Sequence, residues 1–199
     1  MLHTLKINIL LTVFLLMGTS PLIAAEKSFE IGFRGGIGAS SIARKGQDNY
    51  KPQLAYSLGV SLSYRANDLF SFEINTLLNQ RRVLTGQGSS ITINYLALPV
   101  MVKADPLNLG VFFTAGIQFN FLMKASADDR FGNSMDIFSD LNGLVYDVLL
   151  GIGYRSGLIS IEIRYELGIS DLIKDESSFG AETERNSSIL LVIGANFDL

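Results

Sequence analysis

Hydrophobic and polar residues alternate with a period of two along several stretches of the chain. In the clearest stretch, residues 159–170, one face carries Ile159, Ile161, Ile163, Tyr165, Leu167 and Ile169, and the other carries Ser160, Glu162, Arg164, Glu166, Gly168 and Ser170. Residues 54–65 alternate in the same way, with small residues opposite the apolar ones. A period of two places successive side chains on opposite faces of a strand, and no stretch sustains the spacing of an amphipathic helix. The chain from residue 26 onward is therefore predicted to be nearly all β.

Eight strands are predicted from this pattern, at residues 28–41, 54–65, 69–82, 90–104, 109–124, 143–155, 158–170 and 187–199. The fourth strand is the least regular. Its residues Ile91 and Ile93 favour one face, whereas Leu96 and the alternate residues after it favour the other. An extra residue in one strand of a pair causes such a change, so a β-bulge is predicted near Tyr95.

The connections between these strands alternate in length. Residues 66–68, 105–108 and 156–157 are short and contain Asn, Asp, Pro and Gly, which are typical of tight hairpins. The other connections, about 42–53, 83–89, 125–142 and 171–186, are longer and polar. Short turns at one end and long loops at the other indicate an all-β, eight-stranded antiparallel up-and-down transmembrane β-barrel of the bacterial outer membrane.

The composition of the polar face indicates which side meets lipid. In the predicted strands this face carries Glu30, Arg34, Arg65, Glu73, Arg81, Asp147, Arg155, Glu162, Arg164 and Glu166, and no lysine. Arginine suits a crowded interior in which charges must be paired, whereas a solvated face normally uses much lysine. These ten residues are therefore interpreted as a structural salt-bridge network in the lumen. The apolar face then meets lipid, with Phe29, Tyr64, Phe70, Tyr154 and Phe197 as an aromatic girdle at the short-turn end.

The N-terminus predicts export. Lys6 precedes an apolar run from Ile7 to Met17, which is too short for a membrane-spanning helix, and small residues lead up to Ala25. Residues 1–25 are predicted to be a signal peptide and residues 26–199 the barrel domain. Cleavage would remove His3, the one histidine, from a chain that has no cysteine. Nucleophilic sites that need an imidazole or thiolate are thereby excluded, as is nearly every zinc site.

Charge and the remaining motifs add little chemistry. The net charge is −3 and there is no basic block, so no nucleic-acid partner is expected. The glycine-rich residues 35–38 continue as a strand instead of opening a helix, which argues against a phosphate loop. An acidic stretch, Asp128-Asp129-Arg130 with Asn133 and Asp136, could hold a divalent cation or bridge to lipopolysaccharide, but a solvated loop is the favoured interpretation.

Three segments resemble a known family. Residues 32–38 (GFRGGIG), 93–100 (INYLALPV) and 164–171 (RYELGISD) are similar to the small porin-like outer-membrane β-barrel proteins abundant in Bacteroidetes. The final strand, residues 189–199, resembles the terminal assembly signal of outer-membrane proteins, although it ends in Leu199 rather than Phe. The resemblance implies an integral outer-membrane protein that the barrel-assembly machinery inserts, with some relatives serving secretion systems.

We expect a non-enzymatic monomer with a side-chain-filled lumen and long extracellular loops that serve the envelope or a protein partner. No catalytic residue, cofactor or metal is assigned, and the expected lipid contacts are outer-membrane lipid and lipopolysaccharide. Three alternatives stay open. They are a narrow pore, a barrel enzyme acting on lipid or surface peptide, and a soluble lipocalin-like barrel, with the faces reversed, that binds an apolar ligand.

Overall fold

The computed structural model describes residues 28–44, 51–84, 90–129, 131, 133–172 and 184–199. The predicted signal peptide lies outside these residues. The strands are β1 (Ser28–Arg44), β2 (Lys51–Arg65), β3 (Phe70–Leu84), β4 (Ser90–Ala104), β5 (Val111–Asp128), β6 (Ser134–Asp136), β7 (Leu144–Ser156), β8 (Ile159–Gly168) and β9 (Glu184–Asp198). One short 3₁₀ helix, η1, spans Phe138–Asp140. No helix in the described residues is long and apolar enough to cross a membrane.

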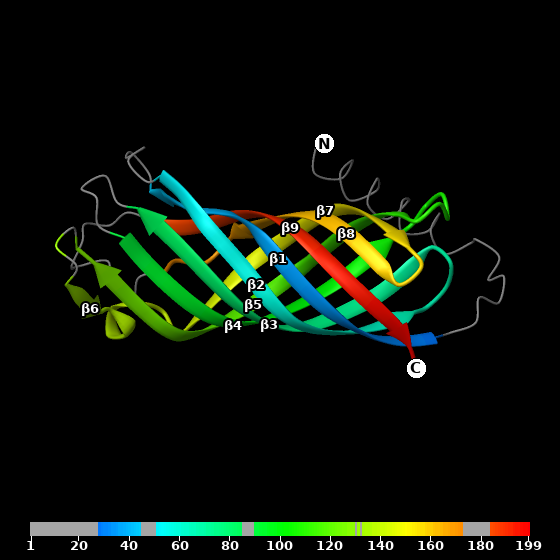
Figure 1. Ribbon diagram of the computed structural model, residues 1–199, viewed down its shortest axis with the longest axis horizontal. Coiled ribbons are helices and arrows are strands. Elements are labelled where there is room, and N and C mark those ends of the chain that lie inside the picture. Colours follow the sequence, from blue (N-terminus) through cyan, green and yellow to red (C-terminus); the bar gives the residue numbers. More distant parts are fainter. Residues whose placement is uncertain (1–27, 45–50, 85–89, 130, 132, 173–183) are drawn as a thin grey trace, which may run out of the picture.

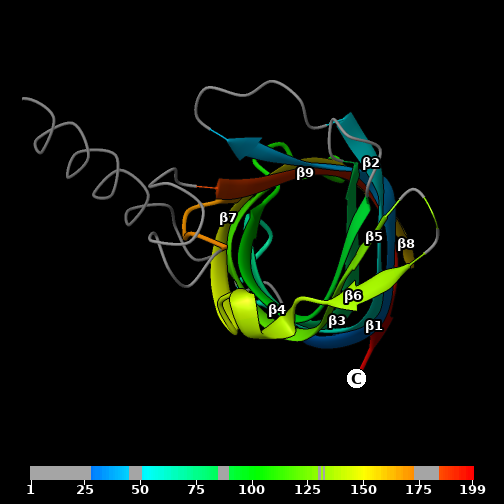
Figure 2. The ribbon, with the colours of Figure 1, turned by 90° about the vertical axis from the view of Figure 1, so that its left-hand side faces the viewer.

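The eight long strands close into a barrel. Each pairs antiparallel with its neighbours, in the order β4-β3-β2-β1-β9-β8-β7-β5, and β4 also pairs with β5. The first and last strands meet from Glu30 opposite Asp198 to Arg44 opposite Glu184. The tilted strands are seen from the side in Figure 1 and form a ring in Figure 2. The predicted eight-stranded antiparallel barrel is confirmed.

The two ends of the barrel differ. At the short-turn end, tight connections join β2 to β3, β4 to β5 and β7 to β8, and the chain terminates after β9 (Figure 1, right). Gly157 adopts a φ of 57° between β7 and β8, a left-handed conformation that glycine accepts without strain. At the long-loop end, β6 and η1 lie between β5 and β7 (Figure 1, left).

Several strands extend a few residues beyond their approximate predicted bounds at the long-loop end. Strand β1 continues to Arg44 and β2 begins at Lys51, so the first connection spans 45–50 instead of 42–53. Strand β5 likewise continues to Asp128, and its last residues pair with β6, which the pattern did not predict. Strands that run past the apolar belt have no lipid-facing side, so hydrophobic alternation no longer marks them.

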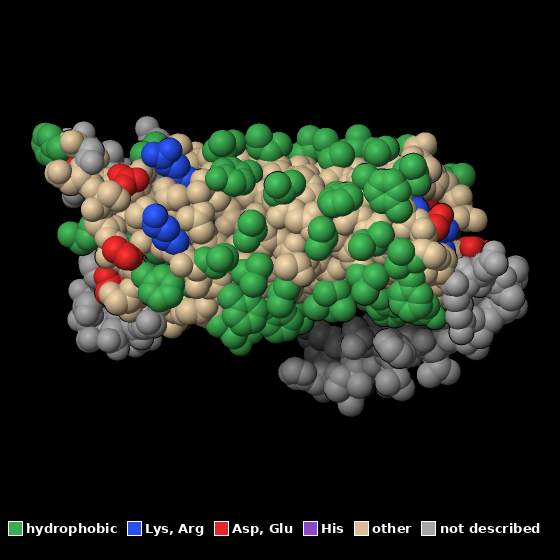
Figure 3. Space-filling model, turned by 60° about the horizontal axis from the view of Figure 1, so that its bottom comes forward, with side chains coloured by type: hydrophobic (Ala, Val, Ile, Leu, Met, Phe, Trp, Pro, Cys, Tyr) green, Lys and Arg blue, Asp and Glu red, His purple; other side chains and the backbone are tan. Residues whose placement is uncertain are grey.

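The outer surface is apolar around the middle of the barrel. Along β8, the residues from Ile159 to Leu167 on the apolar face are exposed, whereas Ser160, Glu162, Arg164 and Glu166 are buried. Figure 3 shows hydrophobic side chains over the middle of one face and charged side chains at its two ends. Of the five predicted girdle aromatics, Phe29, Tyr154 and Phe197 are exposed on this outer surface near the short-turn end, and the Phe29 and Tyr64 ring centroids are 5.0 Å apart. Phe70 is partly buried and is among the residues that line the barrel opening at that end. The exposed apolar face and the buried polar face exclude the alternative of a lipocalin-like barrel with the faces reversed.

A bulge interrupts the pairing of β4 with β5. Asn94 pairs with Lys124 but Tyr95 pairs with Leu122, so Met123 is the extra residue. The prediction of a bulge near Tyr95 is confirmed, but the extra residue lies in β5. Strand β4 itself alternates without interruption, and Ile93 faces inward beside Tyr95.

Candidate functional site

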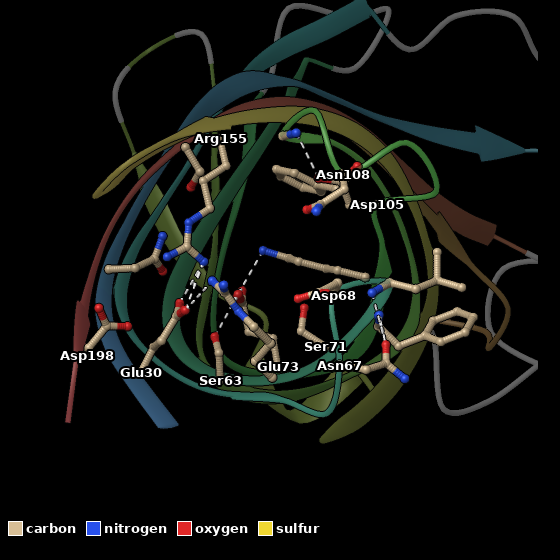
Figure 4. Close-up of a pocket in the computed structure, with 18 of the residues that line it drawn as sticks. Glu30, Ser63, Asn67, Asp68, Ser71, Glu73, Asp105, Asn108, Arg155 and Asp198 are labelled. Atoms are coloured by element: carbon tan, nitrogen blue, oxygen red, sulfur yellow. Dashed lines mark hydrogen bonds and ion pairs between the residues drawn. The ribbon is translucent and has the colours of Figure 1, made fainter. Parts of the chain in front are cut away.

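A cavity of about 500 Å³ opens at the short-turn end of the barrel. Its mouth is formed by the turns, through Asn67, Asp68, Asn108 and Leu158, and its walls by inward residues of the strands. Figure 4 shows acidic, basic and amide side chains projecting into this space from all sides. Both signs of charge are present, so the cavity is an ion-paired vestibule and not a selective binding site for one sign.

Glu30 on β1 lies in the wall of the cavity and is held by two arginines. Its carboxylate accepts hydrogen bonds from Arg65 at 2.8 Å and from Arg155 Nη1 at 3.0 and 2.8 Å. The side chains of Arg65 and Arg155 are 40% and 29% exposed, so these ion pairs are partly hydrated. Partly hydrated pairs are weak, and they close the mouth only loosely.

Glu73 on β3 organises the next layer. Arg34 reaches across β2 and donates to both carboxylate oxygens, at 3.2 and 2.7 Å, and it also donates to Asn196. Lys103 Nζ donates to Glu73 at 2.7 Å and lies 4.9 Å from the centroid of the Phe112 ring. Arg34 and Glu73 are both buried, and the two hydrogen bonds of their bidentate contact offset the cost of removing the two charges from water.

Glycine makes room for the Arg34 guanidinium. A Cβ atom on Gly194 would lie 2.5 Å from Arg34 Nη1, and one on Gly32 would lie 2.9 Å from the same atom. Both glycines face the lumen, where a side chain would displace Arg34. The small residues that alternate with apolar ones in β1 and β9 therefore set the space for the network.

The middle of the lumen contains two further groups of ions, of which one crosses it. Arg164 donates to both oxygens of Glu162 at 2.9 Å, from the same face of β8. Arg81 on β3 reaches across the barrel and donates to Asp147 on β7 at 2.6 Å and to Glu166 on β8 at 2.7 Å. All of these side chains are nearly inaccessible to solvent, so the ion pairs span a dry section of the interior.

The Arg81 layer is supported by neutral groups. Asn120 and Gln118 donate to Asp147 at 2.8 and 3.3 Å, and the Arg81 guanidinium lies 5.6 Å from the centroid of the Tyr95 ring. The partners of Arg81 lie on β4, β7 and β8, so this layer joins opposite walls of the barrel.

An apolar cluster lies beyond this layer toward the long-loop end, on the inner side of β4, β5 and β7. Ile93, Tyr95, Leu122, Ala125, Leu141, Val145 and Leu172 are buried together, with Ile91 and Ile137 packed against them. Leu141 and Leu172 come from the connections and not from the eight long strands. The loops therefore contribute to closing this end.

The structure places all ten predicted network residues on inward positions of the strands and brings each into an ion pair. The statement that the polar face contains no lysine was wrong, because Lys103 lies in the lumen between Glu73 and Glu162, at 2.7 and 3.9 Å. Strand alternation could have found it, since Lys103 lies two residues after the inward Met101.

The network offers little chemistry beyond ion pairing. Within the described residues, no group of three or more His, Cys, Asp or Glu side chains is placed to hold a metal ion. The acidic loop is held by its own contacts, because Asp129 accepts hydrogen bonds from the backbone of Phe131 and from the backbone and side chain of Asn133. This arrangement is an Asx-type turn.

Comparison with known proteins identifies the fold family. Residues 19–174 match the outer membrane protein beta-barrel domain. The chain belongs to this family of outer-membrane barrels. It is an integral protein of the bacterial outer membrane, as the resemblance implied. A sequence comparison with curated proteins gives no match.

Solved structures of small surface barrels have the same fold. Neisserial surface protein A is 14% identical, with a TM-score of 0.54, and the match covers 85% of this chain and 97% of that one. Ail, the attachment invasion locus protein of Yersinia pestis, solved in complex with the heparin analogue sucrose octasulfate, is 13% identical with a TM-score of 0.50, covering 85% and 99%. Identities this low show a shared fold alone and carry no information about ligands.

Proposed function

We propose that this outer-membrane barrel is a non-enzymatic scaffold with a closed interior, whose long-loop end faces the outside of the cell and contacts the envelope or a protein partner. The observation that carries the proposal is the Arg81 bridge to Asp147 and Glu166, backed by the apolar cluster. An interior of eight strands is narrow enough for side chains to close it, and here buried ion pairs cross it and an apolar cluster packs beyond them, so we expect no continuous aqueous path.

The contacts of the carboxylates in the lumen network support a non-enzymatic role. Within the described residues, Glu30, Glu73, Asp147, Glu162 and Glu166 each form an ion pair with an arginine or lysine. A general acid or base needs a carboxyl or imidazole that can exchange a proton with substrate. The one histidine, His3, precedes the barrel, and the chain has no cysteine.

The long-loop end presents the groups suited to contact. The β5–β6 hairpin projects beyond the barrel wall (Figure 1), with Phe131 89% exposed and Met135 69% exposed. Loops on a rigid barrel vary in sequence without disturbing the wall, so recognition by a partner is most simply placed there. Insertion by the barrel-assembly machinery and a monomeric state follow from the same proposal, because the closed barrel has no unpaired wall strand.

Single-cysteine labelling of intact cells tests the proposed orientation, and the cysteine-free chain makes every label specific. Ser134→Cys places a thiol on β6 at the long-loop end, and Leu109→Cys places one in an exposed turn at the other end. We expect a membrane-impermeant maleimide to label the first variant in intact cells and the second only after the cells are broken. The reverse pattern would refute the proposed orientation.

A further inference from the structure

The interior of the barrel has more hydrogen-bond acceptors than donors. Among the described residues, the buried side-chain atoms without a hydrogen-bond partner are all oxygens, apart from Asn75 Nδ2. Three of these oxygens belong to β8 and β9, and they are Glu166 Oε1, Asn186 Oδ1 and Ser188 Oγ. A buried polar atom without a partner is costly, so an occupant that these oxygens can bind would stabilise the folded barrel.

The three oxygens come from neighbouring positions on the inner wall, and we call them the β8–β9 oxygen cluster. Glu166 pairs directly with Ser188, and Asn186 is two residues from Ser188 on the same face of β9. Side chains that lie opposite one another in such a pair start about 4.5–5.5 Å apart, which is within reach of one shared ligand. The next inward residue of β8 is Gly168, which has no side chain to fill the space beside Asn186. All three side chains are 4% exposed or less.

The charge beside the cluster is not balanced within its own layer. Arg81 Nη2 donates to Asp147 Oδ2 at 2.6 Å and to Glu166 Oε2 at 2.7 Å, so the two carboxylate oxygens lie at most 5.3 Å apart, the two bond lengths together. Asp147 also accepts from two amides, whereas the bond from Arg81 is the one hydrogen bond that Glu166 accepts from the described residues. The next cation along β8, Arg164, donates to both oxygens of Glu162. Two buried carboxylates therefore share one guanidinium, and Glu166 is the less compensated of the two.

The chemistry of the cluster selects a singly charged metal ion. Carboxylate, amide and hydroxyl oxygens are hard ligands of the kind that alkali and alkaline-earth cations prefer. One positive charge balances the second carboxylate of the layer, whereas a divalent cation would leave a positive charge in the dry interior. Lys103 does not supply this charge, because it lines the vestibule and contacts Glu73 at 2.7 Å. A water molecule would satisfy the three oxygens but would leave the carboxylate charge in place.

We propose that Glu166, Asn186 and Ser188 bind a monovalent alkali cation inside the barrel, beside the Arg81 layer. The site uses one carboxylate and two neutral oxygens, so it is not a cage of acidic side chains. Its ligands come together only when β8 and β9 pair, and the cation therefore stabilises the folded state. The proposal depends neither on the orientation of the barrel in the membrane nor on a partner at the loops, so the labelling experiment does not bear on it.

The test is urea unfolding of the protein in nonionic micelles at constant ionic strength, with sodium or potassium chloride replacing choline chloride. Choline has the same charge but is too large for such a cluster, so it controls for screening. A ligand that binds only the folded state raises the folding equilibrium constant by the factor 1 + [L]/Kd. We expect this constant to rise with sodium, potassium or both and, above the dissociation constant, to rise nearly tenfold for each tenfold increase in the cation.

Two variants locate the site. Ser188→Ala removes one ligand without changing the charge, and it should raise the cation concentration needed for half of the effect by about tenfold or more, as the loss of a polar contact to a charged group implies. Ser187→Ala is the matched control, because Ser187 is the adjacent residue and pairs with the outward-facing Leu167. Glu166→Gln removes the second carboxylate charge, and its unfolding should not depend on the alkali cation.

Equal stabilisation by choline and by the alkali cations would refute a bound ion, and equal cation dependence in the two serine variants would refute its location. Stronger stabilisation by micromolar calcium would overturn the single charge. No response to sodium or potassium would refute the proposal. If the stability of the wild type then changed with pH while that of Glu166→Gln did not, a proton would be the group that neutralises Glu166.

Discussion

Replacing Arg81 with methionine tests whether the ion pairs of the lumen hold the barrel together. Methionine keeps an unbranched stem but removes the guanidinium, which leaves Glu166 without its 2.7 Å partner and Asp147 with only the amide donors of Gln118 and Asn120. Breaking a buried ion pair on one side typically costs 3–5 kcal/mol, because a charge stays buried without compensation. We expect Arg81→Met to lower the free energy of unfolding by about that amount, roughly 3–5 kcal/mol.

The assay is urea unfolding in nonionic micelles, followed by far-ultraviolet circular dichroism because the chain has no tryptophan. Arg82→Met is the matched control, since the adjacent residue points outward and its loss should change stability by less than about 0.5 kcal/mol. Neutralising all three groups, as Arg81→Met with Asp147→Asn and Glu166→Gln, should recover most of the loss. A cost below about 1 kcal/mol for Arg81→Met would mean that this layer is hydrated like a surface, and would refute the reasoning.

Three further outcomes follow from the interior. Gly194→Ala, whose Cβ would meet Arg34, should destabilise the barrel by about 1–3 kcal/mol in the same assay. The outward-facing Gly35→Ala, with 3.9 Å to Leu58, should have little effect, and equal losses would contradict the packing argument. Glu30→Gln should cost about 1 kcal/mol or less at low salt, because its arginine partners are partly hydrated, and the difference should fall in concentrated salt. A cost that persists in concentrated salt would show that the mouth is dry. Phe112→Leu removes the ring that lies beside the Lys103 ammonium. The free energy of unfolding should fall by about 0.5–1 kcal/mol more in the wild type than in a Lys103→Met background, because this difference isolates the ring contact from any cavity effect.

The strand pattern could be read from the sequence because each long strand has one face in lipid and one in a polar lumen. The inward ion pairs followed from the same alternation, as for Glu162, Arg164 and Glu166. Lys103 lies at the end of its strand, where the alternation is hardest to follow, although it shares the inward register of Met101.

The apolar half of the lumen was not predictable in the same way. Ile93 faces inward because Leu141 and Leu172, distant in sequence, pack over it from the connections. Local alternation contains no information about such contacts, so Ile93 was assigned to a change of face within β4. The bulge prediction found the right place, but the strand that carries the extra residue is decided by pairing between strands, which one strand's pattern does not show.

A barrel with a closed interior conducts no ions, and electrical recording in a planar lipid bilayer measures this. Protein first shown to be folded, by a heat-dependent shift in gel mobility, is inserted beside a general porin that reports successful incorporation. We expect no steady conductance from this barrel, because Arg81, Asp147 and Glu166 cross the lumen and the apolar cluster packs beyond them. A stable, reproducible ohmic channel from the folded protein would contradict it.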